Sequence, residues 1–255
     1  AISVRLTCFP TCGDGALFTV SPVEDSAIAG LVPIGKLNPT GHVFPKDQIY
    51  LYLDTADGTG GNDVVDIRVP GDSWITSVTA ATYLFMTPEY SDYSVVLKPC
   101  ADYELHFGHV EALADEILAE LDGLGSCTTY SSGGADYQHC NYAGLTIPVS
   151  AGDVLGGTSG ISALDFGAYD YRQKLNAFAN EERIEEQGPM LLYAKCPIDD
   201  FEDTVKSQLE SRLGNYDGSI LRTVAPVCGE VSQDEIGTAQ GIWVLKSADN
   251  LYPED

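Results

Sequence analysis

Short runs of apolar, β-branched and aromatic residues recur along the first half of the chain, separated by Gly, Pro and Asp. Such runs favour a pleated, half-buried surface and predict β-strands. The clearest cover residues 49–53, 64–69, 74–86, 93–97 and 103–107, and residues 147–154 return to β character. The pattern predicts a mainly β fold, with a β-sandwich or barrel-sandwich-like core.

Two segments have helical spacing instead. In residues 109–124 and 199–213, large apolar residues recur at steps of three or four, and a Gly follows each segment. This spacing predicts two amphipathic helices, and the fold class expected is a β core with two or three inserted helices. The run of residues 181–186, EERIEE, is typical of a solvated acidic stretch.

The pattern divides the chain into three expected parts. We expect a β and loop extension over residues 1–40, a β domain over 41–195 with the helix 109–124 inserted, and a C-terminal helix with a β extension over 196–255 packed on it. The chain starts at Ala1 without a leader, which a removed signal peptide or a trimmed chain would both explain. No run approaches 18 apolar residues, so no membrane span is expected.

The chain has seven cysteines, and the way they can pair bears on whether the protein is exported or cytosolic. Cys127 and Cys140 flank a Gly/Ser/Tyr-rich loop, and a disulfide there would contribute about 3 kcal/mol in the chain-entropy model. A second bridge is expected between Cys196 and Cys228, and a third, tight one between Cys8 and Cys12. Cys100 is then the free thiol or a link to another chain. This usage favours an exported, extracellular protein over a cytosolic one with reduced cysteines.

The chain carries 38 acidic and 13 basic residues, a net charge of −25. Such a field repels nucleic acid and anionic lipid, so neither is an expected partner. It would suit calcium, and the Asp/Gly-rich segment with Asp54, Asp57 and Asp63 offers oxygen ligands, although without the spacing of an EF-hand. The alternative is a plain turn rich in Asp and Gly.

Catalytic motifs are scarce. The chain lacks a nucleophile elbow, a Walker loop, a dinucleotide fingerprint and HExxH. The segment GGTSG at residues 156–160 is Gly-rich but has no helix behind it, so a tight β-turn is expected there. Four histidines exist, at positions 42, 106, 109 and 139, and a histidine-based metal site must draw on these and on the carboxylates.

Three segments, read in order, carry a resemblance. They are FGHV at residues 107–110, VSAGDVLG at 149–156 followed by GTSG, and ALDF at 163–166. Over roughly residues 41–170 the chain resembles the lysostaphin-type (LytM-like) zinc endopeptidases, which cut peptidoglycan cross-bridges. The resemblance implies a β scaffold, and it implies that His109 stands where the family has a histidine that assists catalysis.

The metal ligands of that family are not reproduced. Ala163 and Asp165 stand where the family carries His-x-His. Upstream, His42 and Asp47 are five residues apart rather than four, and aligning Gln48 with the ligand histidine places Tyr52 at the Asp position. A zinc site of His42, Asp47 and Asp165 is conceivable because carboxylates ligate zinc. The resemblance therefore implies a degenerate scaffold that has lost its metal, with no cofactor, and zinc or calcium as the alternatives.

Two functions remain as hypotheses. The first is a secreted or cell-surface protein without catalytic activity, which binds a cell-wall or glycan ligand or self-associates into an extracellular assembly. The alternative is an active zinc-dependent peptidoglycan endopeptidase, in which only His109 would serve as general acid or base.

Overall fold

The computed structural model describes residues 8–37, 44–54 and 64–243. Two antiparallel sheets dominate them, which confirms a mainly β fold with inserted helices. The long sheet has the order β1-β2-β11-β6-β5-β4-β9-β8, and β12 also pairs with β11. Its strands are β1 (Ile28–Val32), β2 (Gln48–Leu53), β4 (Ser73–Tyr83), β5 (Tyr90–Cys100), β6 (Tyr103–Val110), β8 (Ser126–Ser132), β9 (Ala135–Val149), β11 (Leu164–Asp170) and β12 (Ala194–Lys195).

A smaller sheet has the order β3-β10-β7, built from β3 (Val65–Arg68), β10 (Val154–Thr158) and β7 (Ala112–Leu113). The α-helices are α1 (Asp115–Leu121), α2 (Glu181–Gln187) and α3 (Asp203–Glu210), and three short 3-10 helices cover Asp25–Ala27, Pro189–Leu192 and Pro197–Asp200. No helix among the described residues is long and apolar enough to cross a membrane.

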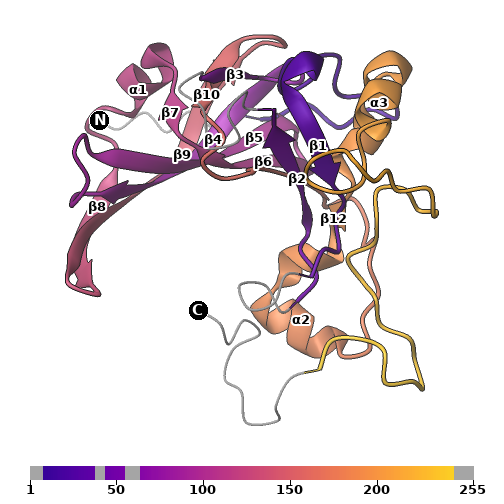
Figure 1. Cartoon of the computed structure of the whole chain (residues 1–255). Helices are drawn as coiled ribbons and strands as arrows, with labels where there is room; N and C mark the ends of the chain where they lie inside the picture. Colours follow the sequence, from indigo (N-terminus) through magenta and orange to yellow (C-terminus); the bar gives the residue numbers. More distant parts are fainter. Residues whose placement is uncertain (1–7, 38–43, 55–63, 244–255) are drawn as a thin grey trace.

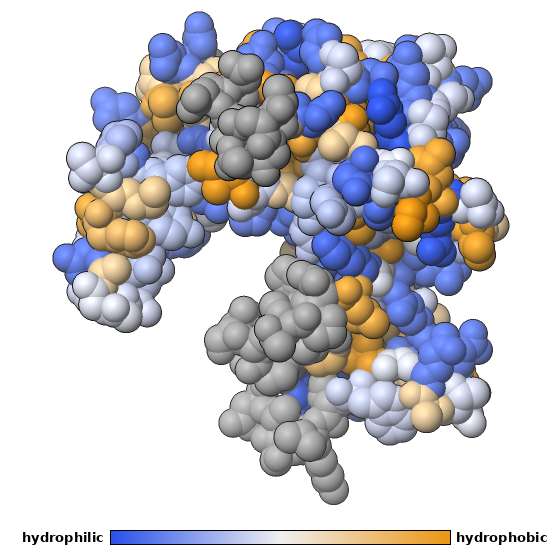
Figure 2. Space-filling view, viewed as in Figure 1, coloured by the Kyte–Doolittle hydropathy of each residue, from blue (hydrophilic) through white to orange (hydrophobic). Residues whose placement is uncertain are grey.

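The long sheet bends into an arch (Figure 1). The small sheet and α1 lie on its convex side, the β8–β9 hairpin forms one limb, and the part of the chain around α2 forms the other. The space-filling view shows the hollow beneath the arch, between the two limbs (Figure 2). One face of the long sheet is therefore covered by the small sheet, and the other faces the hollow.

The core lies between the long sheet and the elements on its convex side. Along β6, Tyr103, Leu105 and Phe107 are almost fully buried and alternate with more exposed residues. Ile67 and Leu155 of the small sheet are buried in the same cluster. Because side chains alternate between the faces of a strand, the residues between these core positions point to the opposite face of the long sheet.

Both predicted helices are shorter than the apolar spacing suggested. The helix predicted over 109–124 was wrong at its start: His109 and Val110 end strand β6, residues 112–113 form β7, and only Asp115–Leu121 is helical. The helix predicted over 199–213 is α3, Asp203–Glu210, preceded by a 3-10 turn. The acidic run at 181–186 is the helix α2, and its Ile184 is buried, so it is not merely a solvated stretch.

The predicted disulfides are correct in two cases of three. Cys127–Cys140 and Cys196–Cys228 are bonded as expected. The pairing Cys8–Cys12 was wrong, because Cys12 bonds to Cys100 and Cys8 is the free, exposed cysteine. The reason is tertiary: the amide of Ala101 bonds the carbonyl of Pro10, which places the N-terminal segment beside the end of β5.

Two predicted turns or loops are strands instead. The Gly/Ser/Tyr-rich loop between Cys127 and Cys140 is the β8–β9 hairpin, which reverses at Gly133 and Gly134, both with positive φ. Glycine is the residue that adopts this conformation without strain. Of the predicted turn at 156–160, residues 156–158 belong to β10 and pair with β3.

Candidate functional site

The face of the long sheet turned away from the core, which we call the open face, carries polar and aromatic side chains. On β2 it carries Gln48, Tyr50 and Tyr52, which alternate with the core residues Ile49 and Leu51; Gln48 and Tyr52 are half-buried and Tyr50 is buried. On β11 it presents Asp165, next to the buried Phe166. Asp165 pairs with Tyr50 on one side and Gly108 on the other, so these positions come together through strand register.

A cluster of four polar residues forms the centre of this face. His109 Nδ1 donates to Asp92 Oδ2 at 2.8 Å, and His109 Nε2 lies 3.7 Å from Asp165 Oδ2. Gln48 Nε2 donates to the same Asp165 Oδ2. We call Gln48, Asp92, His109 and Asp165 the central cluster. It joins strands β2, β5, β6 and β11, whose residues are far apart in the sequence.

The backbone of His109 is unusual. Its φ of +61° lies in the left-handed region, and it is the one residue other than glycine with a positive φ in the described part of the chain. Such a conformation is sparsely populated and persists where surrounding contacts hold it. Here the Asp92 hydrogen bond holds the imidazole in the sheet face, beside Asp165.

The charges of the cluster depend on burial. Burial raises the pKa of the Asp165 carboxyl to about 6, with Asp92 and Asp47 adding to the rise, while His109 and Lys46 oppose it. The hydrogen bond to Asp92 raises the pKa of His109, and Asp165 contributes. Both pKa shifts favour the protonated forms, so the cluster retains protons to a higher pH than the free side chains would.

A second group of contacts borders the cluster on β2 and β11. Tyr169 donates from its hydroxyl to Asp47 Oδ2 at 2.8 Å. Lys36 Nζ lies 4.7 Å from the ring centre of Tyr50 and donates to the Tyr52 hydroxyl at 3.3 Å. Burial raises the pKa of Tyr50, and the negative charges of Asp165 and Asp47 add to this. Tyr50 is thus a neutral phenol beside the cluster.

The described residues at this place do not by themselves form a zinc site. Catalytic zinc sites take three protein ligands, and no group of three or more His, Cys, Asp or Glu in the described ranges is arranged to hold a metal. His109 and Asp165 come together, but Asp47 is bonded to Tyr169. The Gln48 amide N–H occupies Asp165 Oδ2, and an N–H donor is not a metal ligand. His42 lies outside the described residues, so the site of His42, Asp47 and Asp165 stays a prediction.

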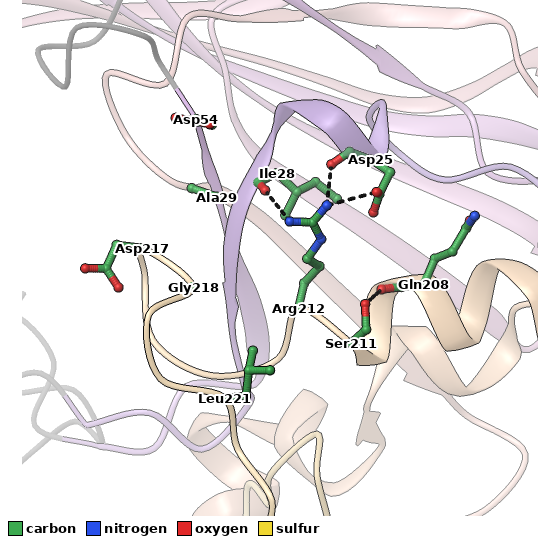
Figure 3. Close-up of a pocket in the computed structure, with 10 residues that line it drawn as sticks. All are labelled: Asp25, Ile28, Ala29, Asp54, Gln208, Ser211, Arg212, Asp217, Gly218 and Leu221. Carbon is green, nitrogen blue, oxygen red and sulfur yellow. Dashed lines mark hydrogen bonds and ion pairs between the residues drawn. The ribbon is translucent and has the colours of Figure 1, made fainter.

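The predicted calcium segment lies mostly outside the described residues, which include Asp54 but neither Asp57 nor Asp63. Asp54 borders a pocket of about 630 Å³ between β1 and the chain after α3 (Figure 3). There Arg212 Nη2 donates to Asp25 Oδ2 at 2.9 Å, and Arg212 Nη1 donates to the carbonyl of Ile28 at 3.4 Å. The guanidinium already neutralises Asp25, so this pocket gathers no set of free carboxylates around a cation.

Comparison with known proteins adds no relative: no protein-family model, curated protein or solved structure matches this chain. The site is therefore interpreted from its own geometry.

The sequence predicted a functional role for His109 and Asp165, named Gln48 only as a position that aligns with a ligand histidine, and gave no sign of Asp92 or Tyr50. Asp92 precedes the core residues of β5 in a polar stretch, YSDYS, and lies 17 residues from His109. The polar and apolar alternation along β2 is a signal that could have placed Tyr50 on the same face as Gln48. Nothing in the sequence gives the register that sets Asp92 against His109.

Proposed function

We propose that this protein is an exported, non-catalytic binding protein on a degenerate lysostaphin-like scaffold, and that its open face binds a cell-wall or glycan ligand. The central cluster is the proposed point of attachment. Polar ligands of this kind present hydroxyl and amide groups, which match carboxylate, imidazole and amide side chains on a sheet face.

One observation carries the proposal. Asp165 Oδ1 is buried and has no hydrogen-bond partner among the described residues, while Oδ2 accepts from Gln48. A buried acceptor without a donor costs free energy, typically about 1–3 kcal/mol. A ligand hydroxyl or amide N–H that donates to Oδ1 would recover this cost, once the Asp165 side chain turns this oxygen toward the ligand.

Export is supported by the three disulfides within the chain. Disulfides persist in oxidising compartments and are rare in the cytosol. They are compatible with an extracellular protein that meets cell-wall material, and the acidic surface is compatible with a partner other than nucleic acid or anionic lipid.

Binding to purified cell-wall sacculi and to soluble glycan fragments tests the proposal. Calorimetry would compare the wild type with Asp165→Ala, which removes the acceptor, and with Asp102→Asn, which alters an exposed carboxylate on the β5–β6 turn. We expect Asp165→Ala to weaken binding about tenfold or more and Asp102→Asn to bind like the wild type. A wild type that binds neither sacculi nor glycans would overturn the proposal. Self-association into an extracellular assembly would then be the function to test, by measuring the size of the protein in solution.

One feature favours the zinc endopeptidase as a second candidate. A carboxylate, Asp92, holds Nδ1 of His109, and such support behind an imidazole is usual where the other nitrogen binds a metal or moves a proton. Metal analysis separates the two candidates. One equivalent of zinc per chain, together with cleavage of cross-linked wall peptides that a chelator stops, would establish the enzyme and exclude the non-catalytic protein.

A further inference from the structure

Strand β8 ends the long sheet, and its outer edge is unpaired in the described part of the chain. All seven of its residues, Ser126–Ser132, are exposed. Exposed edge strands are usually protected by lysine, proline or a bulge. This strand has the sequence SCTTYSS, with neither lysine nor proline, and its register with β9 runs without a bulge. An edge left in this state is a template for a further strand.

The disulfide shows which backbone groups face outward. Opposite residues in an antiparallel pair alternate between hydrogen-bonded pairs with distant Cα atoms and non-hydrogen-bonded pairs with close ones. Cys127 and Cys140 are directly opposite, with their Cα atoms 4.0 Å apart, which is the close kind. The N–H and C=O groups of Cys127, Thr129 and Ser131 therefore point away from β9, toward the free edge.

A row of tyrosines lies beside this edge. Strand register sets Tyr90, Tyr83, Tyr137 and Tyr130 opposite one another across β5, β4, β9 and β8. Neighbouring ring centres are 5.4, 5.5 and 5.5 Å apart along the row. Opposite residues share a face, so the row ends at Tyr130, a residue that is 50% exposed at the edge itself.

Charge indicates what kind of partner fits. Between residues 69 and 171 the chain has fourteen Asp and Glu but a single Lys or Arg, Lys98. Strands β4, β8 and β9 belong to this segment; they carry no Lys or Arg and a single carboxylate, Asp136. A cation placed over an aromatic ring is attracted to it, and the surrounding carboxylates add to the attraction. A second copy of this chain would bring the same net charge of −25 and be repelled.

We propose that β8 binds an extended, basic segment of a partner polypeptide, which adds to the long sheet as a further strand. Its backbone would bond to the outward groups of residues 127, 129 and 131, and every second side chain, Lys or Arg, would lie over Tyr130 and Tyr137. An extended polypeptide is favoured over an amine-bearing glycan because the edge presents N–H and C=O groups at the repeat of a β-strand. This site is separate from the central cluster and does not depend on the function proposed for it.

Fluorescence anisotropy with synthetic peptides tests the proposal. The probe is a labelled eleven-residue peptide with Lys at alternate positions and Thr or Val between them. Three further ligands are compared with it: a copy with Glu for Lys, a copy N-methylated at alternate backbone nitrogens, and a glucosamine oligomer of similar charge. The protein variants are Thr129→Pro, which removes an outward N–H, Thr129→Ala as its matched control, and Tyr130→Ser.

We expect the Lys peptide to bind the wild type and Thr129→Ala equally. Thr129→Pro and the N-methylated peptide should each lose about tenfold in affinity, and Tyr130→Ser about two- to fivefold. The Glu peptide should not bind. N-methylation tests the same hydrogen bonds from the peptide side, so the result stands even where Thr129→Pro alters the hairpin.

Three results would overturn the proposal. The first is no binding of the Lys peptide, and the second is equal affinity for the N-methylated and unmodified Lys peptides. The third is glucosamine-oligomer binding as tight as that of the Lys peptide, which would assign the acidic face to an amine-bearing glycan. Asp165→Asn should leave peptide binding unchanged, because Asp165 lies on β11, which contributes neither to the free edge nor to the tyrosine row.

Discussion

Replacing Asp165 by Asn tests the electrostatics of the central cluster most directly. Burial raises the pKa of this carboxyl from its ordinary value of 3.8 to about 6, which means that the folded protein disfavours its charged form. Asn has nearly the same shape, keeps an oxygen that can accept from Gln48, and carries no charge. The substitution therefore removes the cost of the buried charge and leaves the packing intact.

The size and sign of the effect follow from the two pKa values. Between pH 3.8 and 6 the folded state binds the Asp165 proton more tightly than the unfolded state, so the carboxyl makes stability fall as pH rises through this window. A difference of about two pH units corresponds to about 3 kcal/mol once the pH exceeds 6. The side chain is 17% exposed, so solvent screens little of this. We expect Asp165→Asn to be more stable than the wild type by about 1–3 kcal/mol at pH 7.5.

Urea unfolding of the wild type and the variant at pH 4, 5, 6 and 7.5 measures this. The gain in the free energy of unfolding should be small at pH 4, about 0.5 kcal/mol, because Asp165 is then protonated in the folded state and only about half ionised in the unfolded state, and it should grow to its plateau above pH 6. Asp102→Asn, on an exposed turn, controls for the general effect of removing one charge from an acidic protein. A gain that does not change with pH, or one that the control reproduces, would refute the reasoning.

Two further predictions concern covalent links and hydrogen bonds. Cys12 and Cys100 are 88 positions apart, so their disulfide closes a long loop, and replacing both by Ser should lower the free energy of unfolding by about 4–5 kcal/mol in the chain-entropy model. Replacing the free Cys8 by Ser should change it by less than about 0.5 kcal/mol. Denaturant unfolding measures both effects, and equal losses would contradict the Cys12–Cys100 pairing. Gln48→Leu removes a hydrogen-bond donor from Asp165 and should destabilise the protein by about 1–3 kcal/mol at pH 7.5. The loss should be smaller at pH 4, where the Asp165 carboxyl of the folded protein is protonated. The same urea series measures it, and a loss independent of pH would assign Gln48 a packing role instead.

Most strands could be predicted because their pattern is local. The run at residues 49–53 became β2 and the run at 103–107 became β6, each within a few residues. Side chains that alternate between core and open face leave this trace in the sequence itself. Helix ends were harder. Leu113, Ile117 and Leu121 do have helical spacing, but Val110 is buried in the core as the last residue of β6, and strand pairing outweighs the helical pattern there.

The central cluster could be predicted only in part, because its residues lie far apart in the sequence and are brought together by the register of the paired strands. Asp165 and His109 are 56 positions apart and meet since β11 pairs with β6, while Asp92 reaches His109 from β5. The resemblance placed His109 and Asp165 in one site, but it gave no reason to expect Asp92. The N-terminal disulfide failed in the same way: adjacency in sequence suggested Cys8–Cys12, and the fold brought Cys100 to Cys12.

The proposed loss of zinc and the proposed ligand are linked by one physical requirement. A carboxylate buried in a sheet face needs a cation or hydrogen-bond donors, because burial without them penalises its charge. Gln48 and His109 meet this requirement for Asp165 Oδ2, which the proposed resemblance would place among the positions of zinc ligands. They leave Oδ1 without a donor, and the carboxyl keeps a pKa of about 6. A ligand that donates to Oδ1 would stabilise the charged form, so its binding should lower the pKa of Asp165 and should strengthen as pH rises through 6. Carbon-13 NMR of the carboxyl, with and without glycan, would detect both effects, and a pKa that the bound glycan leaves unchanged would place the ligand elsewhere.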